Sequence, residues 1–215
     1  MNTKQHFFPK MNSENIKFLD ASILVEPGVF TPRAESEIFI PILKNYVKDN
    51  MNLLELGTGT GAISIAIALN FPNINITSVD KNIKAIECAK RNCKLNNVYN
   101  NISFLESDWF SNIRGRKFDL IISNPPYLSK MNFSKYRNLS DPKESLFAED
   151  NGLFEIKSIL DNCKDYARDG STILLEHSHS QTLEIKEYTT NSSIRYLKTY
   201  HDNLGFNRIS LFKKI

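Results

Sequence analysis

The feature that most limits how this chain can fold is a regular alternation of short apolar runs and longer helical segments in its middle part. The apolar runs have the length of buried strands, and the segments that follow them are amphipathic at helical spacing or apolar throughout. Strands are expected at residues 52–56, 74–80, 102–105, 118–123 and 171–175, and helices at 62–69, 82–95 and 153–166. This order predicts a parallel sheet with helices on both faces.

The two ends of the chain depart from the alternation. Apolar residues recur at helical spacing over residues 34–47, but Pro41 lies inside this segment, so we expect a kinked or broken helix. Near the other end, 194–200 and 207–213 are β-rich runs joined by a short turn that contains Gly205. They predict a hairpin at the edge of the sheet. The expected fold is therefore an α/β sheet whose last strand runs antiparallel.

The composition is that of an ordinary globular protein. The 215 residues are 41% hydrophobic and 24% charged, which suits one domain with a sizeable core. A net charge of +3 is too small to argue for nucleic-acid binding by charge alone. Three cysteines without a C-x-x-C pair argue against a disulfide framework and a zinc site, so we expect no bound metal. Because no signal-like segment and no apolar run of about 18 residues occur, we expect a cytoplasmic protein.

A glycine-rich motif follows the first strand of the alternation. Residues 55–61 read ELGTGTG and lead directly into the helix expected at 62–69. Glycines there permit a tight turn and let the backbone approach a ligand closely, while the helix N-terminus offers free amides. The motif predicts a nucleotide-like ligand but does not choose between a dinucleotide and another nucleoside cofactor. The alternative is a purely structural turn.

Acidic residues follow the next two strands. Asp80 ends the second strand, where a carboxylate can accept hydrogen bonds from both hydroxyls of a ribose. Its alternative role is the N-cap of the following helix. After the third strand, the carboxylate of Asp108 suits the amine of adenine and Trp109 offers an apolar wall, although an isolated Asp-Trp pair is usually structural.

The sequence Asn124-Pro125-Pro126-Tyr127 follows the fourth strand, at the edge where open α/β sheets bind ligands. The two prolines remove backbone donors and leave carbonyl oxygens free to face a substrate. With the side-chain oxygen of Asn124 and the ring of Tyr127, these groups can hold a flat –NH2 group and direct its nitrogen lone pair. The alternative is a simple proline turn.

Taken in order, these motifs resemble the class I S-adenosylmethionine-dependent methyltransferases that modify planar nitrogens. The full set is similar to the HemK/PrmC family, the release-factor glutamine N5-methyltransferases. Further matches are VFTPRAESE at 29–37, DPKESL at 141–146, LLEH at 174–177 and DNLGFNRIS at 202–210. The resemblance covers about residues 25–215, and NPPY alone is shared with adenine and guanine N-methyltransferases.

The resemblance implies a Rossmann-like fold, a mostly parallel seven-stranded sheet with an antiparallel C-terminal strand. It also implies S-adenosyl-L-methionine as cofactor, a peptide chain release factor as partner, and methylation of a glutamine amide nitrogen. The implied cofactor-binding residues are Glu55, Gly57, Thr58, Gly59, Thr60, Gly61, Asp80, Asp108, Trp109 and Asn124. The implied catalytic residues are Asn124, Pro125, Pro126 and Tyr127, and Pro32 and Arg33 join these four in binding the substrate.

The chain departs from the family pattern at its N-terminus and within two motifs. Too few residues precede Arg33 to build the helical N-terminal domain usual in the family, so residues 1–30 are expected to form a short extension and 31–215 the methyltransferase domain. Ala34 and Ser36 stand where proline and threonine are usual, and Ser178 where glycine is common. Two alternatives stay open: an amino-methyltransferase acting on nucleic acid, which we do not favour, and a non-catalytic S-adenosylmethionine-binding protein.

Overall fold

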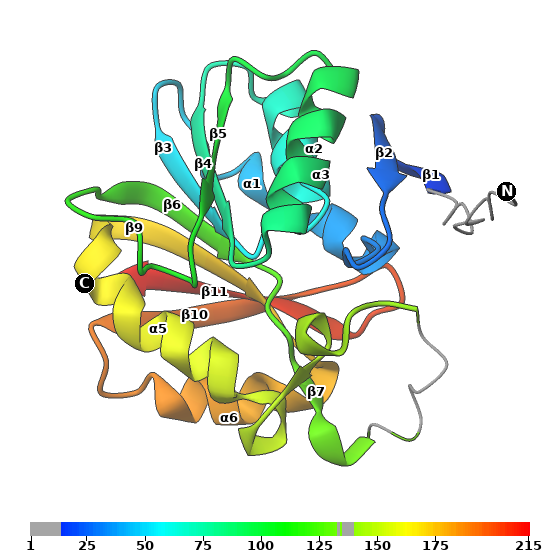
Figure 1. Cartoon of the computed structure of the whole chain (residues 1–215). Coiled ribbons are helices and arrows are strands. Elements are labelled where there is room, and N and C mark those ends of the chain that lie inside the picture. The colour runs from blue at the N-terminus through cyan, green and yellow to red at the C-terminus, as the bar shows by residue number, and fades with distance from the viewer. Residues whose placement is uncertain (1–13, 133, 135–139) are drawn as a thin grey trace, which may run out of the picture.

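The centre of the structure is a twisted seven-stranded sheet (Figure 1). The computed structural model describes residues 14–132, 134 and 140–215. The strand order is β10-β11-β9-β6-β3-β4-β5, and β11 pairs antiparallel with both of its neighbours while β9, β6, β3, β4 and β5 pair in parallel. The bounds are β3 (Asn52–Leu56), β4 (Asn75–Asp80), β5 (Ile102–Glu106), β6 (Phe118–Ser123), β9 (Ala167–Glu176), β10 (Ile194–His201) and β11 (Asn207–Lys214). The expected mostly parallel sheet with an antiparallel C-terminal strand is confirmed.

Helices cover both faces of this sheet. One face carries α1 (Phe39–Leu43), α2 (Ala62–Asn70) and α3 (Ile83–Leu95), and the other carries α5 (Phe154–Tyr166) and α6 (Thr182–Tyr188) (Figure 1). The apolar core is divided accordingly, since alternate residues of each strand face opposite sides. Leu53 packs with α1 and α2, whereas Leu54 packs with α5. Helix α2 is apolar all round because nearly all of it is buried.

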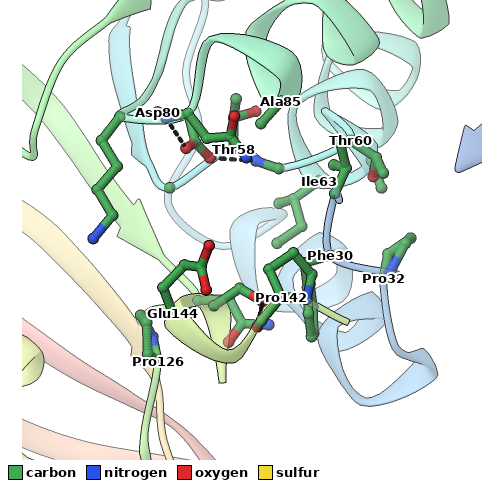
Figure 2. A pocket seen from close by; sticks show the side chains of 18 of the residues that line it. Phe30, Pro32, Thr58, Thr60, Ile63, Asp80, Ala85, Pro126, Pro142 and Glu144 are labelled. Carbon is green, nitrogen blue, oxygen red and sulfur yellow. Dashed lines mark hydrogen bonds between the residues drawn. The ribbon is translucent and has the colours of Figure 1, made fainter. Parts of the chain in front are cut away.

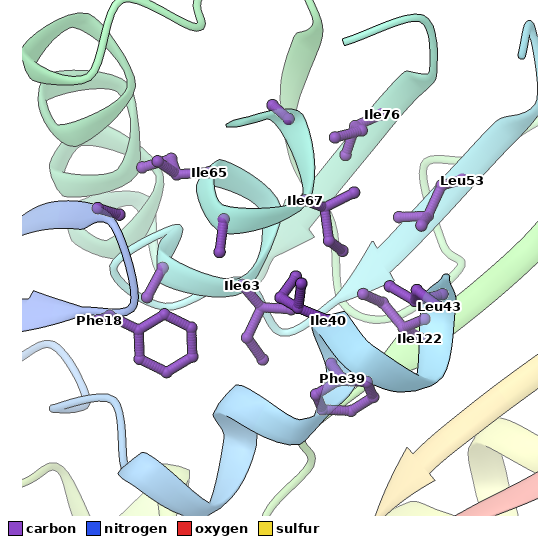
Figure 3. Packing of buried hydrophobic residues seen from close by; sticks show 14 of the residues in the cluster. Phe18, Phe39, Ile40, Leu43, Leu53, Ile63, Ile65, Ile67, Ile76 and Ile122 are labelled. Atoms are coloured by element: carbon purple, nitrogen blue, oxygen red, sulfur yellow. The ribbon is translucent and has the colours of Figure 1, made fainter. Parts of the chain in front are cut away.

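A β-hairpin that the sequence did not predict covers α2 and α3. It consists of β1 (Glu14–Phe18) and β2 (Ala21–Val25), and Phe18 joins the same apolar cluster as Ile65 and Phe39 (Figure 3). Two asparagines bond the backbone of β2: Asn92 of α3 pairs with Leu24, and Asn96, the C-cap of α3, pairs with Ser22. The hairpin therefore shares a core with the rest of the chain, and the domain boundary expected near residue 30 stays a prediction.

Several boundaries differ from those expected. The helix predicted over 34–47 is a 3-10 turn, η1 (Ala34–Ile38), followed by the single-turn α1, so the break precedes Pro41. Pro41 is tolerated because it lies in the first turn of α1, where the backbone N–H has no partner within the helix. Strand β9 begins at Ala167, before Gly170, and not after it as expected. Strand β11 lies inside the sheet, so that β10 forms the edge.

Short elements fill the connections after β6 and β9. They are β7 (Leu128–Ser129), η2 (Lys130–Asn132), η3 (Lys143–Ser145), β8 (Phe147–Ala148), η4 (Asp150–Gly152) and η5 (His179–Gln181). Strands β7 and β8 pair in parallel, which ties the segment after residue 140 to the chain that leaves β6. Within the described ranges, no helix is long and apolar enough to cross a membrane.

Candidate active site

A cavity opens at the carboxyl ends of β3, β4, β5 and β6, where parallel sheets bind ligands (Figure 2). It encloses about 950 Å³ of empty space, part of which is open to solvent. In Figure 2, Asp80 and Thr58 face Glu144, Pro142 and Pro126 across this space. Its walls come from residues Gly28–Phe30, Pro32, Ser36, Gly57–Thr60, Ala62, Ile63, Asp80–Asn82, Ala85, Ser107–Trp109, Asn124, Pro126, Pro142, Glu144 and Ser145.

Glu55 supports the glycine loop after β3 (residues 57–61) from the protein interior. This carboxylate is fully buried and accepts hydrogen bonds from Thr58 Oγ1 (2.6 Å) and from the Ser64 hydroxyl at the start of α2. The backbone amides of Gly57 and Thr58 both donate to the Val79 carbonyl at 2.9 Å. Glu55 is therefore not in the cavity wall, and its contribution in this geometry is to shape the loop.

Burial raises the pKa of Glu55 from 4.5 to about 7, although three hydroxyl hydrogen bonds oppose this. Between about pH 4.5 and 7, the folded state therefore keeps a proton on Glu55 that the unfolded state has lost. The free energy of unfolding falls as pH rises through this range and then levels off. We expect Glu55→Gln to abolish this contribution, so that its stability relative to wild type grows by on the order of 3 kcal/mol between pH 4 and 8. Urea unfolding at several pH values measures this difference. A difference that does not change with pH would contradict the burial argument.

Two glycines of the loop are constrained differently. Gly59 (φ +55°) has nothing within 4 Å of the position of a Cβ, whereas a Cβ on Gly61 (φ +80°) would lie 3.0 Å from the Cβ of Ala89 in α3. The left-handed backbone costs any other residue about 1–2 kcal/mol at either position. Only Gly61 adds an overpacking cost of about 1–3 kcal/mol. We therefore expect Gly61→Ala to lose at least 1 kcal/mol more stability than Gly59→Ala in urea unfolding; equal losses would show that α3 moves aside freely.

Asp80 at the end of β4 connects the glycine loop to the next helix. Its Oδ2 accepts from the Gly59 amide and its Oδ1 from the Asn82 amide, both at 2.9 Å (Figure 2). Asn82, and not Asp80, is the N-cap of α3, since its side chain accepts from the Lys84 amide. Burial raises the pKa of Asp80 despite these backbone bonds. Each carboxylate oxygen retains acceptor capacity toward the cavity.

Asp108 and Trp109 form the wall beyond β5. Asp108 is exposed at the cavity rim, while Trp109 takes a left-handed conformation (φ 45°) that directs its ring against Gly57. A carboxylate of α5 fixes this ring, because Trp109 Nε1 donates to Glu155 Oε2 at 2.8 Å. The backbone between β4 and β5 is joined here as well: the Ser107 amide donates to the Asp80 carbonyl.

A buried polar network lies behind Asn124. Its Nδ2 donates to Ser36 Oγ (3.0 Å), and Ser36 donates to Oε2 of Glu176 (2.6 Å) at the end of β9. The hydroxyl of Tyr127 donates to the other oxygen of Glu176 at 3.0 Å. Glu176 is 0% exposed, so burial raises its pKa to about 7, and burial together with the Glu176 charge also raises the pKa of Tyr127. Sequence reasoning did not select Ser36 or Glu176 as site residues.

The chain after Asn124 is fixed at Tyr127. Gln181 Nε2 donates to the Tyr127 carbonyl at 3.0 Å, and Gly152 packs so closely that a Cβ on it would lie 2.1 Å from that carbonyl oxygen. Tyr127 also packs into the apolar cluster beside α5. The loop that presents Asn124 is therefore rigidly held on the side away from the cavity.

The opposite wall joins two segments distant in sequence. Arg33 forms an ion pair with Asp141, which also accepts from the Thr31 amide at 2.7 Å. This contact places Phe30 and Pro32 beside Pro142 at the cavity mouth (Figure 2). Only the sequence match to the family had indicated these segments, and neither carries a strong local signal.

The structure brings most of the expected site residues to one cavity. Ten of them line it: Pro32, Gly57, Thr58, Gly59, Thr60, Asp80, Asp108, Trp109, Asn124 and Pro126. Five are outside its wall: Glu55 and Gly61 shape the loop, Arg33 binds Asp141, Pro125 is buried, and Tyr127 donates to Glu176. The part of the wall formed by residues 28–30, Pro142, Glu144 and Ser145 was not among the expected site residues.

The known proteins to which this chain is similar in sequence are methyltransferases. Residues 20–138 match the family model described as methyltransferase small domain. A release factor glutamine methyltransferase of Buchnera aphidicola subsp. Acyrthosiphon pisum is 35% identical over 202 residues, which is 92% of this chain and 72% of that protein. A second one, of Aliivibrio fischeri, is 32% identical over 199 residues, 91% of this chain and 70% of that protein.

Solved structures share the fold. A methyltransferase from Pyrococcus furiosus superposes with a TM-score of 0.68 at 22% identity, covering 91% of this chain and 90% of that one. The Buchnera enzyme is thus 35% identical over most of both chains. The glycine loop and the Asn-Pro-Pro-Tyr segment also meet at one cavity. This chain belongs to the release factor glutamine methyltransferase family.

Proposed function

We propose that this methyltransferase transfers a methyl group from S-adenosyl-L-methionine to the side-chain amide nitrogen of a glutamine in a peptide chain release factor. The observation that carries the proposal is the network behind Asn124, which fixes a side-chain amide at the wall of the glycine-loop cavity. The substrate is inferred from the names of the relatives, which are release factor glutamine methyltransferases. A cytoplasmic location is part of the proposal and is supported by three free, buried cysteines.

The cavity residues fit this cofactor. Gly59 leaves open space where any side chain would project, which suits close approach of a ligand to the backbone. The Asp80 carboxylate would accept from ribose hydroxyls, Asp108 from the adenine amine, and Trp109 would cover the base. Thr58, Thr60 and Gly57 would line the remaining contact, with Glu55 and Gly61 acting through the loop that they shape. The division into an extension (1–30) and a methyltransferase domain (31–215) belongs to the proposal.

Bound S-adenosylmethionine supplies an electrophilic methyl group on a sulfonium. An amide nitrogen attacks poorly because its lone pair is delocalised into the carbonyl. Asn124 Oδ1 and the Pro125 carbonyl would accept the two N–H groups, which favours a pyramidal nitrogen and stabilises its developing positive charge. Pro126, Pro32 and, through their neighbours, Arg33 and Tyr127 would shape the substrate entry. Transfer would exchange the carbon–sulfur bond for a nitrogen–carbon bond, and the methylated nitrogen would lose its extra proton to water.

The test is methyl transfer from labelled S-adenosylmethionine to purified release factor, with the modified residue located by mass spectrometry of its peptides. The control is the same factor with the accepting glutamine replaced by alanine, which should take no label. Label on tRNA or DNA and none on the factor would move the enzyme to the nucleic-acid amino-methyltransferases. Cofactor binding without transfer to either class would indicate a non-catalytic binding protein.

A further inference from the structure

The hydrogen bonds around Asn124 form a directed chain from the cavity wall into the protein interior. Asn124 Nδ2 donates to Ser36, Ser36 donates to Glu176, and Tyr127 donates to the second oxygen of Glu176. Ser36 comes from η1 and Glu176 from the carboxyl end of β9, which pairs with β6, the strand that ends directly before Asn124. Ser36 is 1% exposed and Glu176 is 0% exposed. Ser36 lines the cavity beside Asn124, whereas Glu176 lies outside the cavity wall.

The donor-to-acceptor direction of these hydrogen bonds determines the orientation of the Asn124 amide. A serine hydroxyl has one proton, and the short bond of 2.6 Å to the Glu176 carboxylate uses it. While Glu176 is ionised, Ser36 therefore accepts from Asn124, and the –NH2 end of the amide faces Ser36. The oxygen end is turned the other way, and no hydrogen bond from a described residue reaches it. Without Ser36, nothing in this network distinguishes the two ends of the amide.

We infer that Ser36 and Glu176 are positioning residues, which act through Asn124 by holding its amide with the oxygen toward the substrate. This inference rests on the proposed function, because the Asn124 oxygen is taken to accept from the substrate –NH2 group. A flipped Asn124 would present a donor to a group that is itself a donor. Both residues would then influence the rate of methyl transfer without touching the substrate or the cofactor.

The sharpest test compares Ser36→Thr with Ser36→Val. The two side chains have the same shape, and only threonine keeps the hydroxyl. We expect Ser36→Thr to retain kcat within about threefold of wild type. We expect Ser36→Val to lose about tenfold, the rate equivalent of one hydrogen bond of roughly 1.4 kcal/mol. The Kd for S-adenosylmethionine should stay within about twofold in both, which a general loss of structure would not allow.

A double-mutant cycle then asks whether Ser36 acts through Asn124. In single-turnover reactions at saturating cofactor, Ser36→Val should slow the Asn124→Ala enzyme by less than about twofold. An undiminished tenfold effect in that background, or equal rates for the threonine and valine variants, would overturn the inference. If Ser36→Val does not fold, Ser36→Ala replaces it in both comparisons. Absence of methyl transfer by the wild-type enzyme would instead refute the proposed function, so the two failures are distinguishable.

Discussion

Replacement of Asn124 by alanine is expected to lower kcat for methyl transfer by about 10²–10³-fold, the usual cost of removing one preorganised polar contact to developing charge. The proposed bond from the substrate nitrogen to Asn124 Oδ1 strengthens as that nitrogen becomes positive. An interaction of this kind raises kcat and does not simply lower KM. The measurement is single-turnover transfer at saturating cofactor, together with the Kd for S-adenosylmethionine, which should change much less than the rate.

A suitable control for Asn124→Ala is Asn101→Ala. Asn101 also uses its side-chain amide as a donor, to the Pro72 carbonyl, but it lies near the amino ends of the strands, away from the cavity. Its replacement should leave the rate of transfer unchanged. Equal rates for wild type and Asn124→Ala would remove Asn124 from the chemistry and leave the Asn-Pro-Pro-Tyr segment as a structural turn.

Sequence reasoning predicted the central sheet and the cavity well because both depend on local patterns. Apolar runs determine β3 and β6 to the residue, and polar residues that end parallel strands must gather at one edge of the sheet. The glycine loop, Asp80, Trp109 and Asn124 all follow this rule, although their predicted roles in binding and catalysis stay predictions. The ELGTGTG motif also fixed the start of α2, since a helix follows the last glycine.

The residues that sequence reasoning missed depend on contacts between distant segments. The β1–β2 hairpin is bonded by the side-chain amides of Asn92 and Asn96. In the sequence, Asn92 is simply a polar residue of an amphipathic helix and Asn96 the residue that follows this helix. Ser36 has no local signal, and its partner Glu176 lies 140 residues away. Glu176 did offer one indication: it is a carboxylate directly after the apolar run STILL, and it ends the strand next to β6, which Asn124 follows.

Replacement of Asp80 by alanine is expected to weaken S-adenosylmethionine binding by about 1.5–3 kcal/mol, the cost of losing hydrogen bonds to a charged group. Part of this loss is direct, from the ribose hydroxyls, and part comes from the Gly59 amide that Asp80 holds in place. Asp119 provides the matched control, because it also accepts from a backbone amide, that of Asn52, but at the opposite end of the strands. Calorimetric titration should show a weakened Kd for Asp80→Ala and an unchanged Kd for Asp119→Ala. If Asp80→Ala binds as tightly as wild type, the ribose assignment is wrong and the bond from the Gly59 amide to Asp80 does not contribute to cofactor binding.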